Sequence, residues 1–140
     1  MSRMLTRAKH RLIGAKNYRT YAGNDDSFVD SLCFDVQQSL EFVLKALVEL
    51  HGADYVENHD IRAQLNKLDS LGVEVPYAQE LRNMSVTINS WETESRYKDS
   101  FIATLSDVDK VIFITEELIN FADSFIQVET LTEVDAFKDD

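Results

Sequence analysis

Apolar residues recur through the middle of the chain at the spacing of one face of an α-helix. Between residues 29 and 50 they follow one another at steps of three or four: Val29, Leu32, Val36, Leu40, Val43, Leu47 and Leu50. Polar residues such as Gln37, Glu41 and Lys45 occupy positions between them. Because a helix turns once every 3.6 residues, this spacing places the apolar side chains on one buried stripe. We therefore predict a long helix over about residues 26–51, around which the rest of the chain packs.

The same spacing predicts further helices on both sides of this central one. They cover about residues 2–21, 60–70, 76–91 and 104–127. Pro76 is expected in a first helical turn, where its fixed φ angle is favourable, and the polar segment 92–101 is expected to form a loop. No segment alternates apolar and polar residues clearly enough to predict a strand. The pattern predicts an all-α fold, an up-and-down bundle of about five helices.

The last residues differ from the rest in composition. Residues 127–140 contain five acidic residues and one lysine. Such a segment is expected to be flexible, because charge repulsion opposes its packing. We therefore predict one helical domain over residues 1–126 and an acidic tail over residues 127–140.

Charge is distributed very unevenly along the chain. The formal net charge is −11, yet residues 1–23 contain six basic residues and no acid. Two interpretations are open: an arm that binds nucleic acid, or a basic helix that lies beside acidic neighbours. We favour the second, and expect no RNA binding, because the acidic remainder of the chain would repel a polyanion.

The cellular setting follows from what the sequence lacks. No apolar run approaches the roughly 18 residues of a membrane span, and the N-terminus has no signal-peptide core. The single cysteine, Cys33, cannot form an internal disulfide and is expected to be a buried, inert thiol. We expect a cytoplasmic protein without membrane contact.

Three short motifs occur in a fixed order along the predicted helices. They are QQSLEFVLKAL at Gln37–Leu47, HDI at His59–Ile61, and the pair Arg96–Tyr97. Together they resemble the HEPN family of helical domains over about residues 1–126, although Lys98 stands where many members have proline. The resemblance implies a bundle built on two long antiparallel helices, frequently as a dimer.

The resemblance also implies a choice of functions. Members act as ribonucleases, as toxins paired with a small nucleotidyltransferase, or as domains proposed to bind nucleotides. The ribonucleases carry an arginine followed, after four to six residues, by a histidine near the late helices. Neither Arg82 nor Arg96 has a histidine at that spacing. We therefore expect a non-catalytic module and assign no catalytic residue. The alternative is a ribonuclease toxin of a toxin–antitoxin pair with atypical catalytic residues.

Residues in the three motifs define a candidate nucleotide site. Lys45, His59 and Arg96 would converge on a phosphate, and Tyr97 would stack on a base. A structural role is also open, because Glu41 precedes Lys45 at the spacing of a helical ion pair. Glu41 has no second metal ligand at helical spacing and the chain has no glycine-rich phosphate loop, so no metal site and no cofactor are predicted.

Association with other chains is the remaining expectation. The central predicted helix carries more apolar side chains than one stripe requires, including Phe28, Phe34 and Phe42. Such surplus is typical of helices buried on two sides and of dimer interfaces. We predict a homodimer formed through the long helices, with a nucleotidyltransferase-like protein as a possible partner.

Overall fold

The chain folds into a bundle of α-helices. The computed structural model describes the backbone of residues 3–21, 26–97 and 105–138 and the side chains of residues 3–21, 28–92 and 105–126. Those segments contain helices and no strand, so the all-α prediction is confirmed. In chain order the helices are α1 (Arg3–Tyr21), α2 (Asp26–Leu50), α3 (Ile61–Ser70), α4 (Ala78–Tyr97) and α5 (Leu105–Lys138).

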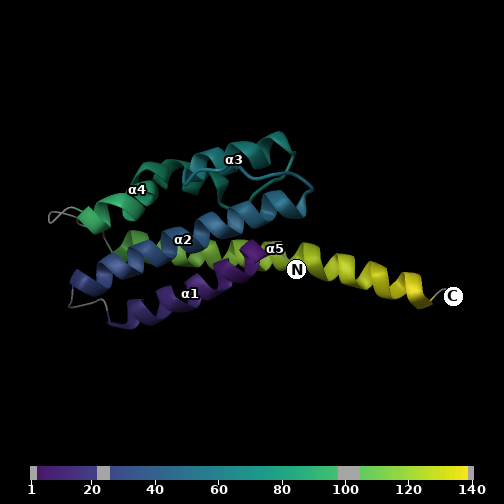
Figure 1. Cartoon of the computed structure of the whole chain (residues 1–140), viewed down its shortest axis with the longest axis horizontal. Helices are drawn as coiled ribbons and strands as arrows, with labels where there is room; N and C mark the ends of the chain where they lie inside the picture. The colour runs from purple at the N-terminus through teal and green to yellow at the C-terminus, as the bar shows by residue number, and fades with distance from the viewer. Residues whose placement is uncertain (1–2, 22–25, 98–104, 139–140) are drawn as a thin grey trace.

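Helix α2 is the centre of the bundle, as its apolar spacing predicts. It contacts α1, α3, α4 and α5. Figure 1 shows α1 antiparallel to α2, with α3 and α4 on the opposite side of α2 from α1. Helix α5 crosses α2 in this view and contacts both α1 and α2. Leu44, Ala46 and Val48 lie outside the predicted stripe and are nevertheless fully buried. A helix covered on two sides needs apolar residues around most of its circumference.

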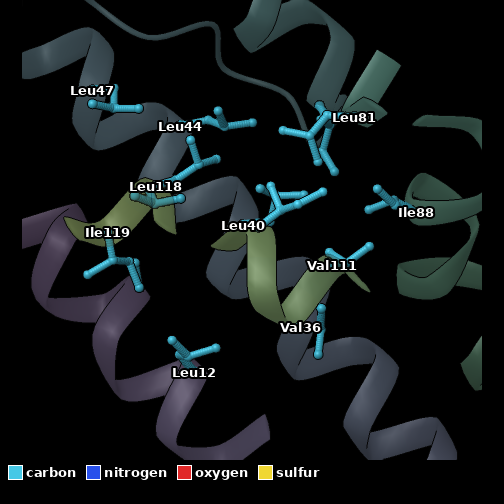
Figure 2. Packing of buried hydrophobic residues seen from close by; sticks show 14 of the residues in the cluster. Leu12, Val36, Leu40, Leu44, Leu47, Leu81, Ile88, Val111, Leu118 and Ile119 are labelled. Atoms are coloured by element: carbon cyan, nitrogen blue, oxygen red, sulfur yellow. The ribbon is translucent and has the colours of Figure 1, made fainter. Parts of the chain in front are cut away.

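Buried apolar residues from all five described helices form the core. In Figure 2, side chains of α2 such as Leu40 and Leu44 lie between Leu81 of α4 and Leu118 of α5. All four side chains are buried. Burial of this apolar surface is the dominant favourable contribution to folding.

Helix α1 approaches α2 closely because small residues lie between the two. Ala8 and Ala15 are fully buried, and the hydroxyl of Ser39 donates a hydrogen bond of 2.7 Å to the Ala8 carbonyl. A Cβ atom on Gly14 would lie 3.1 Å from Oδ2 of Asp35. The glycine that weakens α1 as an isolated helix thus allows the close crossing.

The basic first helix lies beside acidic side chains, as the favoured interpretation of its charge predicts. Lys9 pairs with Asp123, Lys16 with Glu116 and Arg19 with Asp109, at 2.9, 3.0 and 2.6 Å. All three acids belong to α5. These ion pairs join the first and last helices across the bundle.

Both predicted ends of the fourth helix are wrong. Helix α4 begins at Ala78, and Tyr77 has a left-handed φ of 61°, so Pro76 is not in the first helical turn. Helix α4 also continues to Tyr97, so residues 92–97 are helical and not a loop. Its polar end contains glutamate and arginine, which favour helix, and neither glycine nor proline interrupts it. Residues 98–101 of the predicted loop lie outside the described part.

Helix α5 is longer than predicted. It ends at Lys138 and not near Gln127, and Figure 1 shows its C-terminal end extending beyond the other helices. No glycine or proline follows residue 105, so the acidic composition alone does not stop the helix. The assignment of residues 127–140 as a separate flexible tail stays a prediction. In the described segments, no helix combines the length and the apolar character that crossing a membrane requires.

Candidate functional site

Glu41 is a carboxylate buried among polar partners in the middle of α2. Only 1% of the residue is exposed. Its Oε1 accepts a hydrogen bond of 2.8 Å from Lys45 Nζ and lies 2.8 Å from Nδ1 of His59. Its Oε2 accepts a bond of 3.1 Å from Gln37. Burying a charge is costly unless it is paired and hydrogen-bonded, and here both carboxylate oxygens have partners.

Two of these partners follow directly from helical geometry. Gln37, Glu41 and Lys45 are spaced four residues apart, so they lie on one face of α2. The Lys45 ammonium also lies 5.0 Å from the centre of the Tyr55 ring, a favourable contact between a cation and an aromatic face. Lys45 is only 7% exposed as a result.

The third partner, His59, is held by the connector between α2 and α3. Gln64 of α3 donates to the Val56 carbonyl at 2.7 Å and accepts from the Val56 amide at 3.3 Å. Asp60 caps α3, because its carboxylate accepts a bond of 3.0 Å from the Arg62 amide. The connector is therefore fixed on both sides of His59, whose imidazole side chain is 66% exposed.

Helix α4 completes the site with Asn89 and Glu92. Asn89 accepts a bond of 3.2 Å from the Ile61 amide and donates one of 2.9 Å to Asp60. Glu92 Oε1 lies 3.6 Å from His59 Nδ1. We refer to Glu41, Lys45, His59 and Glu92 as the Glu41 cluster. A cavity of about 390 Å³ opens beside it, lined by Asn58, His59, Asp60, Asn89 and Glu92.

The structure brings together two of the four residues predicted to bind a nucleotide. Lys45 and His59 meet at the same oxygen of Glu41. Arg96 and Tyr97 lie in the last turn of α4, and their side chains are outside the described part. The four-residue nucleotide site therefore stays a prediction.

The charge around Lys45 and His59 does not favour an anion. Glu41, Glu92 and Asp60 carry three negative charges against the one positive charge of Lys45, which gives a formal −2 with His59 neutral. A phosphate would be repelled by this local field, whereas a cation would be attracted.

Sequence reasoning did not find Glu92 or Asn89 as site residues. Glu41 has no second ligand at helical spacing, and His59 and Glu92 come from the α2–α3 connector and from α4. Separations of 18 and 51 positions leave no periodic signal. Only the packing of α3 and α4 on α2 brings these side chains to Glu41.

A second site lies between α1 and α2, which we call the α1–α2 groove. It has a volume of about 770 Å³ and is lined by Arg7, His10, Arg11, Gly14, Tyr18, Asp35 and Phe42. The favoured sequence interpretation placed the basic residues of the first helix beside acidic neighbours and assigned them no ligand. The sequence alone does not predict how the cationic and aromatic residues lie relative to each other, because this depends on how α1 packs on α2.

The groove combines cations with aromatic rings. The guanidinium of Arg7 lies 6.0 Å from the centre of the Phe42 ring, and that of Arg11 lies 5.9 Å from the Phe34 ring. Arg11 also pairs with Asp35 at 3.2 Å. Burial raises the pKa of Asp35, and the charge of Arg11 opposes that rise.

The formal charge of the groove is positive. Arg7, Arg11 and Asp35 sum to +1 with His10 neutral. Among the described side chains, Arg7 forms no ion pair, so its guanidinium is available to an anionic ligand. The groove thus has the opposite charge to the Glu41 cluster.

Arg82, the first of the two late arginines, forms no pair with a histidine among the described side chains. Arg82 donates to Asn66 at 2.7 Å and to Asp69 at 3.1 Å, both on α3. Asn89, one of the positions where the ribonucleases would have histidine, binds Asp60 and the Ile61 amide. Both residues thus join α4 to α3.

Fold and sites together define an all-α protein, a helical bundle organised around one long central helix, with two polar sites of opposite charge. Comparison with protein families identifies it further: the model of the HEPN domain matches residues 1–125, and the chain belongs to this family. A search of curated proteins and a search of solved structures returned no match.

Proposed function

We propose that this HEPN-domain protein is a non-catalytic binding module whose ligand is a nucleotide held in the α1–α2 groove. The observation that carries the proposal is the composition of this groove. Two arginines and a histidine lie beside Tyr18 and Phe42, on a chain whose net charge is −11. A positive groove on an acidic protein favours a small anion over a large polyanion, which the rest of the surface would repel.

The groove offers both contacts that a nucleotide needs. The planar guanidinium of Arg7 matches a phosphate in a two-bond arrangement, and Arg11 supplies a second cation beside it. The rings of Tyr18 and Phe42 provide surfaces on which a base stacks. The competing location is the predicted set Lys45, His59, Arg96 and Tyr97, where the nearby carboxylates weigh against phosphate.

Isothermal titration calorimetry with ATP, in a chelator-containing buffer, tests the proposal. Arg7→Gln is expected to weaken binding by about tenfold or more, because a charged hydrogen bond to phosphate is lost. Arg62→Gln is the matched control, since it removes the same charge from an exposed position on α3 outside the groove. Binding that is unaffected by Arg7→Gln but lost in His59→Gln would place the nucleotide at the competing location.

We also propose that the protein associates as a homodimer, and a nucleotidyltransferase-like protein is the alternative partner. An exposed aromatic pair supports this. Tyr77 and Phe113 pack edge to face with ring centres 5.8 Å apart, although they remain 39% and 51% exposed. Exposed aromatic side chains of this kind are enriched in protein interfaces.

Light scattering coupled to size-exclusion chromatography measures the association. We expect a dimer mass at micromolar concentration for the wild type and a monomer mass for Phe113→Ser. Val86→Ser is the control, because Val86 is apolar, 78% exposed and located on α4. Equal masses for wild type and Phe113→Ser would rule out this surface as the interface.

A ribonuclease toxin is the alternative function, and one feature favours it. His59 has an exposed ring whose Nδ1 is held by Glu41, an arrangement that orients a histidine for proton transfer. Incubation of labelled RNA with wild type and with His59→Ala tests it. The non-catalytic proposal predicts intact RNA in both samples, whereas cleavage that requires His59 would establish the alternative.

A further inference from the structure

We propose that the Glu41 cluster binds a divalent transition-metal cation, with Glu41, His59 and Glu92 each supplying one ligand atom. This site is separate from the α1–α2 groove and would exist whether or not the groove binds a nucleotide. The proposal rests on the geometry of three side chains from three elements.

The three ligand atoms are already close together. Glu41 Oε1 and Glu92 Oε1 lie 2.8 and 3.6 Å from His59 Nδ1, and ligand atoms of all three residues fall within 4.8 Å of one another. Ligands that surround Zn²⁺ tetrahedrally at about 2.1 Å are about 3.4 Å apart. The required adjustment falls mainly on His59 and Glu92, whose side chains are 66% and 20% exposed and therefore have room to move.

The ligand types and the local charge agree with a transition metal. One imidazole and two carboxylates suit Zn²⁺ and its first-row neighbours better than Mg²⁺ or Ca²⁺, which prefer oxygen alone. Asp60, hydrogen-bonded to Asn89 beside the cavity, adds negative charge near the ligands. The formal −2 of the site is balanced by a divalent cation.

Lys45 competes with the metal for Glu41. Its ammonium donates to the same oxygen, Oε1, that faces His59. Metal binding would therefore require Glu41 to release this hydrogen bond or to offer its other oxygen, which now accepts from Gln37. Lys45 lowers the metal affinity by repulsion, and removing its charge is expected to raise that affinity.

Metal binding also requires His59 to lose the hydrogen on Nδ1. With Nδ1 at 2.8 Å from a carboxylate, that nitrogen carries the hydrogen, because the carboxylate only accepts. To bind a metal, Nδ1 gives up this hydrogen, which either moves to Nε2 by tautomerisation or leaves to solvent from a protonated ring. In either case Nε2 then carries the hydrogen of the ring.

Calorimetric titration of the tag-free full chain with ZnCl2 tests the site, and visible absorption of bound Co²⁺ reports the coordination number and geometry of the bound ion. We expect one Zn²⁺ per chain, with Kd raised about tenfold or more by Glu92→Gln and by His59→Ala, the scale on which weaker metal-site contacts act. His10→Gln is the control for adventitious binding to a surface histidine and should change Kd by less than about twofold. Lys45→Met should lower Kd.

Two results would overturn the proposal. One is the absence of Zn²⁺ binding at about 1 mM, a concentration at which even weak sites fill. The other is binding that Glu92→Gln and His59→Ala leave unchanged. Both of these variants alter partly exposed side chains, so they are expected to fold, and far-ultraviolet circular dichroism checks this. They decide the outcome even if Lys45→Met fails to fold.

Discussion

At the scale of single residues, Glu41 combines a structural role with a chemical one. It neutralises Lys45, whose ammonium also packs against the Tyr55 ring, and both residues are buried. Removing one partner leaves an uncompensated charge in a medium that solvates it poorly. Replacing both by apolar residues removes the charges together.

Glu41→Ala is therefore expected to lower the free energy of unfolding by about 3 kcal/mol, because Lys45 then stays buried without its carboxylate. The double variant Glu41→Leu/Lys45→Met should recover most of this loss. Urea denaturation followed by circular dichroism measures both. A loss below about 1 kcal/mol for Glu41→Ala would mean that Lys45 reaches solvent easily.

Asp35 makes stability depend on pH in the opposite sense to a typical paired carboxylate. Burial raises its folded pKa above the ordinary 3.8, so the folded state binds the proton more tightly than the unfolded state. Its contribution to stability therefore falls as the pH rises above about 4.

Asp35→Asn removes this dependence. We expect the stability of Asp35→Asn relative to wild type to increase as the pH rises from about 4 to 6, and urea midpoints across that range measure it. An unchanged difference would contradict the raised pKa.

Cys33 is buried, as the sequence predicts. It is fully buried, and burial, aided by the charge of Asp30, raises its pKa to about 12. Because the thiolate is the reactive form, the native protein should resist iodoacetamide at pH 8, and unfolding in urea should expose the thiol. Mass spectrometry counts the modified chains. Rapid labelling of the native state would show that the helices around Cys33 separate readily.

At the scale of elements, Asn89 joins α4 to the start of α3. It accepts from the Ile61 amide, which has no partner within its own helix, and it holds the capping Asp60 in place. Asn89→Ala should lower the free energy of unfolding by about 1–2 kcal/mol, the usual cost of a lost cap. Asn83→Ala is the control on the same helix, since Asn83 is exposed and bonded only locally, to Gln79. Equal effects of the two variants would contradict the capping role of Asn89.

The helices themselves could be predicted because their signal is local. A repeating stripe of buried residues identifies α2 over its whole length, and the glycines that follow α2 and α3, Gly52 and Gly72, have the left-handed φ expected at helix ends. The start of α4 could not be predicted, because it depends on Tyr77, a residue that rarely adopts a positive φ. Polar composition also misplaced the ends of α4 and α5, since it resembles that of a loop.

The candidate sites were harder to predict than the helices, for a related reason. The pair Glu41–Lys45 follows from spacing on one helix and is observed. The contacts of Glu41 with His59, and of His59 with Glu92, join residues from the connector and from α4. Such contacts depend on how helices pack, which a single sequence does not specify.

At the scale of the whole molecule, charge separates the two sites. The α1–α2 groove is positive and lies on one side of α2, while the Glu41 cluster is negative and faces α3 and α4. The ion pairs between α1 and α5 neutralise three of the basic residues and leave Arg7 available. This separation is the basis for assigning the anionic ligand to the groove and the cation to the cluster.

A two-dimensional ¹H–¹⁵N NMR titration of the protein with ATP, in the presence of a chelator, distinguishes the groove from the Glu41 cluster as the nucleotide site. We expect the shifted amide signals to concentrate on Arg7–Tyr18 of α1 and on Asp35–Phe42 of α2, which line or border the groove. Shifts concentrated on His59–Arg62 and on α4 from Asn89 to Tyr97 would contradict this expectation. They would show that the nucleotide binds at the acidic cluster despite its charge.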